Sequence, residues 1–427
     1  MNTDPAEGRN RNVVADDFPI NEPLDEPTLE LTAPRRRGVG LCLSGGGYRA
    51  ALFHLGAVRR LDEYGLLGNL RTVSSVSGGS IFSAFLARAL PWPRPQPLPS
   101  EVWEVQVARP FRAFCTQDLR TAPLLARLQP WNWWGSSAIE RVAALLEQRL
   151  DLGRLGSLPR TPNFVLCATD MAFGVNWVFE RTRMGDYRAG YARHDGAYPL
   201  ALAAAASACF PPVFSPLHLD LSPEQLRRGR ARTRPDFPQL VRGLRLTDGG
   251  NYDNLALEPV WKTHAVMLVS DGGSTFDFAA DRGRWARLPR HLSILDAQSR
   301  SLRKRWLLAE SGKGTHVSAY WSVGQHVSAY ASRLPSSAAC LQHGYSPEVA
   351  ELIGGIRTDL DAFSEGEIAA LENHGYALGD AAVQSFVAGT ASSLPTFRLP
   401  HPDWQDETRV RAALRSSHRT QLLGRSR

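Results

Sequence analysis

The chain has 427 residues, of which 43% are hydrophobic, 21% charged and 9% aromatic. This composition excludes a fully disordered, a collagen-like and a disulfide-scaffold protein, and a chain of this length can bury a large core without a metal or a disulfide. The formal net charge is +7, and almost all the basic side chains are arginine. So uniform a bias indicates genome composition rather than separate phosphate sites, and we expect no nucleic-acid partner.

The segment 1–34 carries eight acidic and two basic side chains and few aromatics. It offers too little apolar surface to order itself, which predicts a disordered acidic tail. It lacks the apolar stretch of a signal peptide, and no run elsewhere approaches 18 consecutive apolar residues. We therefore expect a cytoplasmic protein whose contact with membranes, where it occurs, is peripheral.

Two strand–turn–helix units follow the tail. The first has an apolar run at 39–43, then glycines, then leucines and valines at helical spacing over 52–61. The second has a β-branched run at 70–76, then Ser77-Gly78-Gly79, then an apolar helix. Successive units of this kind predict an α/β sheet.

The remaining elements are predicted less sharply. A proline-rich loop at 91–99 precedes helices over 101–150, which the tryptophans 131, 133 and 134 interrupt. Further strands are expected at 163–168, 175–180, 244–246 and 265–269, and an exposed arginine-rich loop at 222–243. The pentad His-Val-Ser-Ala-Tyr occurs at 316–320 and 326–330, too few copies for a repeat protein. We expect one domain over 35–400 and a basic tail over 401–427.

Ser77 is the first candidate for chemistry. A serine on a tight strand-to-helix turn has an exposed hydroxyl, and small residues two before and two after allow that turn to close. Gly79 fits the pattern, whereas Ser75 stands where glycine is usual. Gly78 begins the helix, whose N-terminus favours a developing negative charge. A plain glycine–serine loop has the same sequence pattern, so this pattern alone does not show that Ser77 is catalytic.

Gly45, Gly46 and Gly47 form a second candidate one unit earlier. Consecutive glycines let N–H groups converge on a phosphate or on the oxyanion of an acyl-transfer intermediate. The Gly-Lys-Ser/Thr of a P-loop is missing, and Arg49 stands at the helix start instead. A tight βα turn with no ligand is the simpler alternative.

Two aspartates follow short apolar strands, where α/β proteins bind ligands. Asp248 and Asp271 each precede two glycines, and only Asp248 is followed by the further pair Asp253-Asn254. Either aspartate could instead cap its own turn.

Together these motifs resemble the patatin-like phospholipase family over roughly residues 38–390. The resemblance rests on Gly45-Gly46-Gly47-x-Arg49, Ser75-x-Ser77-Gly78-Gly79 and Asp248-Gly249-Gly250-x-x-Asp253-Asn254, and extends through Ala168-Thr169-Asp170, Ala206–Phe214 and Ile356–Ser364. It implies a three-layer α/β/α fold with a mostly parallel central sheet.

The resemblance also implies hydrolysis of lipid acyl esters without a cofactor. Ser77 would be the nucleophile, Asp248 its base, and the turn of Gly45, Gly46 and Gly47, with Arg49 beside it, the oxyanion hole. An ordinary aspartate has a pKa near 3.9, so proton transfer would have to accompany attack. The same groups could transfer the acyl chain to another alcohol, and a catalytically silent lipid- or protein-binding module stays open.

The other features of the sequence say less about function. The five cysteines form no C-x-x-C pair, no ligand spacing predicts a metal site, and none of the histidines stands in a catalytic motif. The tryptophans at 131–134 and the arginines at 222–243 suit a membrane surface, although packing and solvation explain such residues equally well. Oligomeric state, headgroup and acyl-chain preference are not encoded in any motif.

Overall fold

The computed structural model describes residues 36–121, 138–211, 214–273, 280, 283–387, 394–415, 417, 420–421 and 425–426. The predicted acidic tail and the tryptophan cluster at 131–134 lie outside these residues. Within the described part, no helix is long and apolar enough to cross a bilayer.

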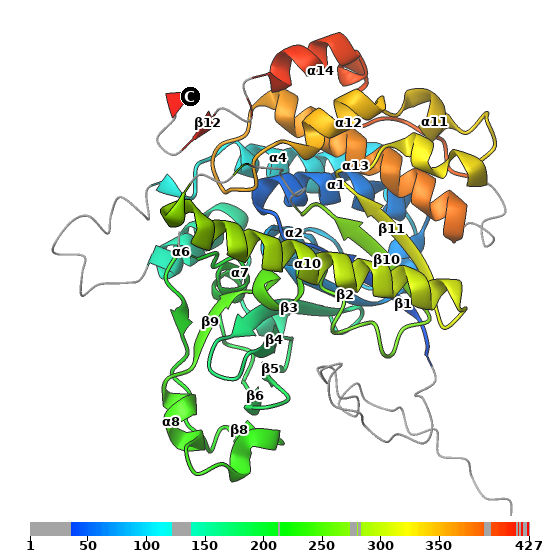
Figure 1. Ribbon diagram of the computed structural model, residues 1–427. Helices are drawn as coiled ribbons and strands as arrows, with labels where there is room; N and C mark the ends of the chain where they lie inside the picture. Colours follow the sequence, from blue (N-terminus) through cyan, green and yellow to red (C-terminus); the bar gives the residue numbers. More distant parts are fainter. Residues whose placement is uncertain are drawn as a thin grey trace, which may run out of the picture.

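A mixed sheet of 11 strands runs through the molecule (Figure 1). Five neighbouring strands are parallel to one another, and the strands beyond them are antiparallel. The mostly parallel centre predicted for the sheet is confirmed. Across the sheet the order is β11 (Val317–Ser322), β10 (Val266–Asp271), β1 (Val39–Leu43), β2 (Leu70–Val76), β3 (Asn163–Asp170), β4 (Val175–Phe179), β5 (Arg183–Asp186), β6 (Gly190–Arg193) and β8 (Leu226–Arg227).

β9 (Arg245–Asp248) and β7 (Leu217–His218) lie off this order. β2 pairs with β3 as far as Cys167, and β9 continues along β3 from Ala168, running antiparallel to it. The carboxyl ends of β2 and β9 therefore meet head to head: Val76 lies beside Cys167 and Asp248 beside Ala168. This insertion brings two distant parts of the chain to one point of the sheet edge.

Helices cover both faces of the sheet, which makes three layers (Figure 1). In β1, Leu41 and Leu43 pack under α1, α2 and α13, whereas Cys42 faces the layer made by the segment 250–264 and α10. This alternation follows from the two-residue period of a strand. The helices are α1 (Gly47–Glu63), α2 (Gly78–Ala89), α3 (Ser100–Trp103), α4 (Arg109–Cys115), α6 (Ala138–Leu150), α7 (Leu200–Ser207), α8 (Phe237–Arg242), α9 (Gly250–Asp253), α10 (Arg284–Gly312), α11 (Ala339–His343), α12 (Pro347–Gly354), α13 (Glu365–Phe386) and α14 (Glu407–Leu414).

Two sequence expectations need correction. The arginine-rich segment 222–243 is not one loop, because it contains β8 and α8. The domain boundary expected at 400 lies too early, because α14 packs against α12 and α13. Val410 and Leu414 are buried there together with Trp404. Val410 and Leu414 are four residues apart and so lie on one face of α14, which they fix to the core beside Trp404.

Candidate active site

Ser77 stands between β2 and α2, at the carboxyl edge of the sheet. Its backbone has φ 52° and ψ −122°. A non-glycine residue in this region carries strain of about 1–3 kcal/mol, and such strain is kept mainly at functional sites. The side chain is nearly enclosed, with 9% of Ser77 exposed. The turn has the geometry of a nucleophile elbow.

Ser75 does not disturb this turn. It lies inside β2 and is not among the residues with positive φ, so the position does not require glycine. Gly79 is different, because a Cβ there would overlap the carbonyl oxygens of Leu43 and Ser44. Only the second of the two small residues flanking Ser77 is therefore obligatory.

Ser207, at the end of α7, forms hydrogen bonds that hold the backbone of the elbow. Its hydroxyl accepts a hydrogen bond from the Ser77 N–H at 2.9 Å and donates one to the Cys167 carbonyl at 2.5 Å. The Ser80 hydroxyl lies 2.8 Å away from it. Ser207 belongs to the Ala206–Phe214 stretch of the resemblance, but no sequence argument gave it a role. The only signal in the sequence was a serine within an alanine-rich stretch.

We expect Ser207→Ala to lower kcat about tenfold and leave KM within about twofold, because the Ser77 N–H loses its acceptor and the elbow shifts. Ser83→Ala is the matched control, since Ser83 is equally buried in α2 and its hydroxyl has no partner among the described residues. Steady-state kinetics and thermal melts of both variants test this prediction. An equal fall in kcat for both would show a general packing effect instead.

The glycine turn lies against the elbow. Gly46 and Gly47 have φ 138° and 57°, and a Cβ on Gly78 would overlap the backbone of Gly47. Only glycines allow this approach. Within the described part of the chain, the N–H groups of Gly46, Gly47 and Gly78 have no hydrogen-bond partner. These three donors are available to an anion beside Ser77.

Gly45 and Arg49, also expected at the oxyanion hole, use their donors elsewhere. The Gly45 N–H donates to the Asn254 carbonyl at 3.1 Å. The buried Arg49 guanidinium donates to the carbonyls of Gly272, Gly354 and Ile356 at 2.7–3.2 Å. Through these hydrogen bonds both residues hold the turn in place.

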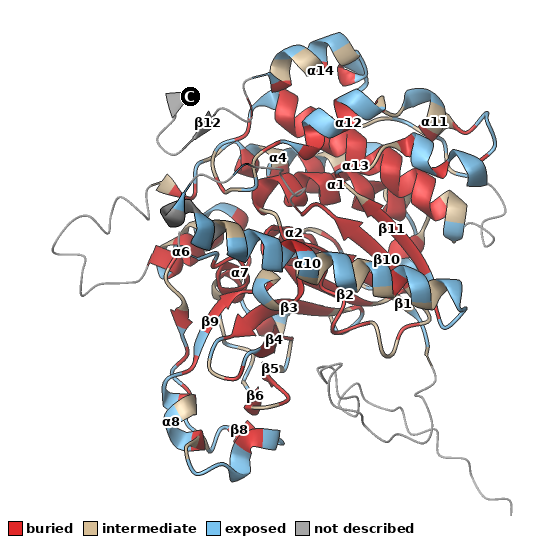
Figure 2. Ribbon diagram, in the orientation of Figure 1, coloured by how far each residue is buried: buried red, intermediate tan, exposed pale blue. Residues whose placement is uncertain are grey.

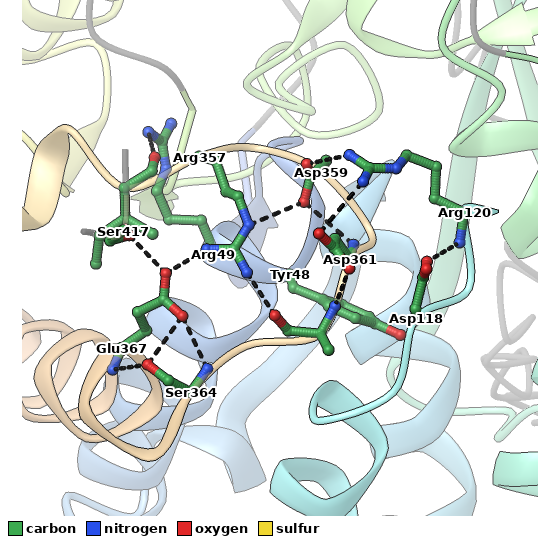
Figure 3. Close-up of polar contacts among 12 residues, drawn as sticks. Tyr48, Arg49, Asp118, Arg120, Arg357, Asp359, Asp361, Ser364, Glu367 and Ser417 are labelled. Atoms are coloured by element: carbon green, nitrogen blue, oxygen red, sulfur yellow. Dashed lines mark hydrogen bonds and ion pairs between the residues drawn. The ribbon is translucent and has the colours of Figure 1, made fainter. Parts of the chain in front are cut away.

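A strap at 356–363 lies across the same turn (Figure 3). The Asp359 carbonyl accepts the Tyr48 N–H at 3.0 Å, and a Cβ on Gly47 would overlap that carbonyl. The Asp359 carboxylate pairs with Arg120 at 2.5 Å and with Arg357 at 3.5 Å. The strap therefore fixes the start of α1 through the backbone and is itself held by ion pairs.

Asp248 lies beside the elbow at the end of β9. One of its carboxylate oxygens accepts the Gly250 N–H at 2.7 Å. Burial raises the pKa of the Asp248 carboxyl to about 7; hydrogen bonds from the Gly250 N–H and the Ser77 hydroxyl lower it, but by less. Desolvation dominates because a buried carboxylate loses water that two hydrogen bonds do not replace. A carboxylate that titrates near 7 beside a serine can act as a general base.

Asp253 and Asn254, the pair that follows Asp248, organise this region. The Asp253 carboxylate accepts the N–H groups of Leu255, Leu257 and Glu258 at 2.7–3.1 Å. Asn254 packs on Gly45 and accepts its N–H. The trailing pair thus ties the segment after Asp248 to the glycine turn.

The rival bases are engaged otherwise. Asp271 ends β10, two strands from β2, and accepts the Tyr320 hydroxyl at 2.7 Å and the Gly273 N–H at 2.9 Å. His54 lies between the Ser270 hydroxyl and the Ser44 carbonyl, and burial lowers its pKa to about 4. Among the described residues, neither forms a hydrogen bond with Ser77.

Comparisons with known proteins agree with this arrangement of motifs. A family model described as patatin-like phospholipase matches residues 41–261, more than half of the chain. No curated protein sequence matches the chain.

Two solved structures are similar to the chain over most of its length. Human GIVD cytosolic phospholipase A2 is 13% identical with a TM-score of 0.41, covering 92% of this chain and 64% of that one. VipD from Legionella pneumophila is 14% identical with a TM-score of 0.33, covering 82% of this chain and 67% of that one. The chain spans less than two thirds of the length of the human enzyme.

Proposed function

The chain belongs to the patatin-like phospholipase family, and from this premise we propose that it hydrolyses acyl esters of lipids with Ser77 as nucleophile and Asp248 as base. One observation carries the proposal: a buried carboxyl whose pKa is raised to about 7 lies beside the hydroxyl of a serine at a strained turn. An aspartate at its ordinary pKa would be a far weaker base. Burial supplies the basicity that the amino acid lacks.

In the first half-reaction, the Ser77 oxygen attacks the ester carbonyl carbon while the Asp248 carboxylate takes the hydroxyl proton. The carbonyl oxygen becomes an oxyanion, which the free N–H groups of Gly46, Gly47 and Gly78 stabilise. The tetrahedral intermediate then collapses, and Asp248 gives its proton to the departing alcohol. An acyl group remains on Ser77.

In the second half-reaction, Asp248 takes a proton from water, which attacks the acyl carbon and releases the fatty acid. Ser77 recovers its proton from Asp248, and the site returns to its starting state. If an alcohol occupies the place of water, the same steps transfer the acyl chain to it. Product analysis with and without an added alcohol separates hydrolysis from transfer, and a binding module would yield neither product.

The pH profile tests the role of Asp248. Its base form is the carboxylate, so kcat/KM for a soluble ester should fall as the pH drops below about 7. We expect a loss of about 90-fold between pH 8 and pH 5 for a pKa near 7, against less than about 10% for an ordinary aspartate. Initial rates measured over this range decide. A flat profile would contradict a base with a raised pKa.

A further inference from the structure

The N-terminal half of α10 is largely exposed in the described structure (Figure 2). Every side chain described from Arg287 to Asp296 is exposed or half-buried, and Ala297 is the first that is buried. Three of these residues, Leu288, Leu292 and Leu295, are 67%, 60% and 65% exposed. Large apolar side chains grouped in this way mark a surface that meets a partner.

Four of the exposed leucines share one face of the helix, whereas Leu308, which is 45% exposed, lies on the other side. Leu288, Leu292, Leu295 and Leu302 follow one another at intervals of four, three and seven residues, which keeps them in line along a helix. Leu302 is 59% exposed. We call these four side chains the α10 face. Ala297, on the opposite side, and Leu307, to one side of this face, are buried.

The charge of α10 indicates what the α10 face meets. The helix carries seven basic residues and only two acidic ones, Asp296 and Glu310. Arg300 and Arg303 form ion pairs with acidic side chains of the protein, and the other five basic residues still outnumber the acidic ones. A basic helix with an apolar face lies in the interface of an anionic bilayer, where leucines enter the acyl boundary and cations meet headgroups. A charge of this sign would instead oppose the docking of a second copy of the same helix.

α10 also touches the candidate active site. Arg303 donates to the Tyr252 carbonyl at 2.9 Å and pairs with Asp253 at 3.6 Å. A Cβ on Gly273 would lie 3.0 Å from the Arg300 guanidinium. Asp296, next to Leu295, is near enough to Asp248 to add to the rise in its pKa. The α10 face therefore adjoins the segment that carries the proposed base.

We propose that the α10 face docks on an anionic lipid bilayer and so brings the site to its substrate. This inference rests on the proposed function, because the lipid ester makes the membrane the partner. Docking supplies the lipid at a surface, and the neighbouring Asp248 and Ser77 then act on molecules drawn from it.

Vesicle flotation tests the proposal in the Ser77→Ala background, where vesicles stay intact. We expect binding to vesicles of phosphatidylcholine with phosphatidylglycerol, weakened by salt. Leu288→Gln, Leu292→Gln and Leu295→Gln together should lower the partition constant at least about tenfold. The matched control, Val105→Gln with Leu394→Gln, replaces side chains that are 58% and 54% exposed elsewhere, and should bind like its parent.

A fluorescent probe gives a second measurement that does not depend on the triple variant. The five native cysteines are buried, so a polarity-sensitive dye can be attached selectively to Leu295→Cys or Val105→Cys. Vesicles should shift the emission to the blue at position 295 and not at 105.

Absence of vesicle binding by the parent, or equal binding by the triple variant, would overturn the proposal. So would a parent dimer that the triple variant converts to a monomer while vesicle binding stays unchanged. Turnover of a soluble ester by the unsubstituted protein tests the proposed function separately.

Discussion

Ser77→Ala is expected to lower kcat/KM for acyl-ester hydrolysis at least about 10⁴-fold, because no other group can form the acyl intermediate. The substitution removes one oxygen from a side chain that is 9% exposed and keeps the same Cβ at the same strained φ. The melting temperature should therefore stay nearly constant. Rates with a soluble p-nitrophenyl ester and a thermal melt provide the test. A variant that retained more than a few per cent of the activity would show that Ser77 is not the nucleophile.

Asp248→Asn should have the second largest effect, a fall of about 10³–10⁴-fold in kcat/KM. Asparagine keeps the acceptor for the Gly250 N–H but cannot take a proton from Ser77. Because a neutral amide avoids the desolvation of a buried charge, the folded state should lose little stability. The same ester assay and a urea titration measure the two effects.

Asp271→Asn is the matched control for this variant. Asp271 also ends a strand, precedes two glycines and is buried, but its contacts are Tyr320 and Gly273. Turnover per folded molecule should stay within about threefold of the parent, even if the lost hydrogen bond costs about 1–3 kcal/mol of stability. The opposite ranking of the two variants would assign the base to Asp271.

Local sequence was sufficient for the parts of the site that are local. The runs ending at 43 and 76 predicted β1 and β2, and the glycines after them predicted the tight turns. Strand, turn and helix are contiguous there, so hydrophobic period and glycine spacing determine the geometry. The free N–H groups of Gly46 and Gly47 follow from the same local pattern.

The other parts of the site depend on tertiary contacts between segments that are distant in the sequence. Nothing near Asp248 in the sequence shows that β9 enters beside β3 and meets the end of β2. Arg49 looked like an oxyanion donor because it is close in sequence, yet its partners lie more than 200 residues away. Its burial among those carbonyls could be seen only in the folded chain.

The repeated pentad makes the same point about secondary structure. His-Val-Ser-Ala-Tyr at 316–320 leads into β11, where β10 is available as a partner. In the second copy, His326 precedes a 3-10 helix over Val327–Arg333, which contains the other four residues of the pentad. Propensity is the same in both copies, so the neighbouring strand made the difference.

The most direct test of the account is to treat the protein with an alkyl fluorophosphonate and map the adduct by peptide mass spectrometry. Ser77 should displace fluoride and carry a single phosphonyl group. Asp248→Asn should slow the labelling, and Ser77→Ala should abolish it. Absence of an adduct on Ser77, or an adduct on another serine that persists in Ser77→Ala, would contradict a Ser77–Asp248 hydrolase.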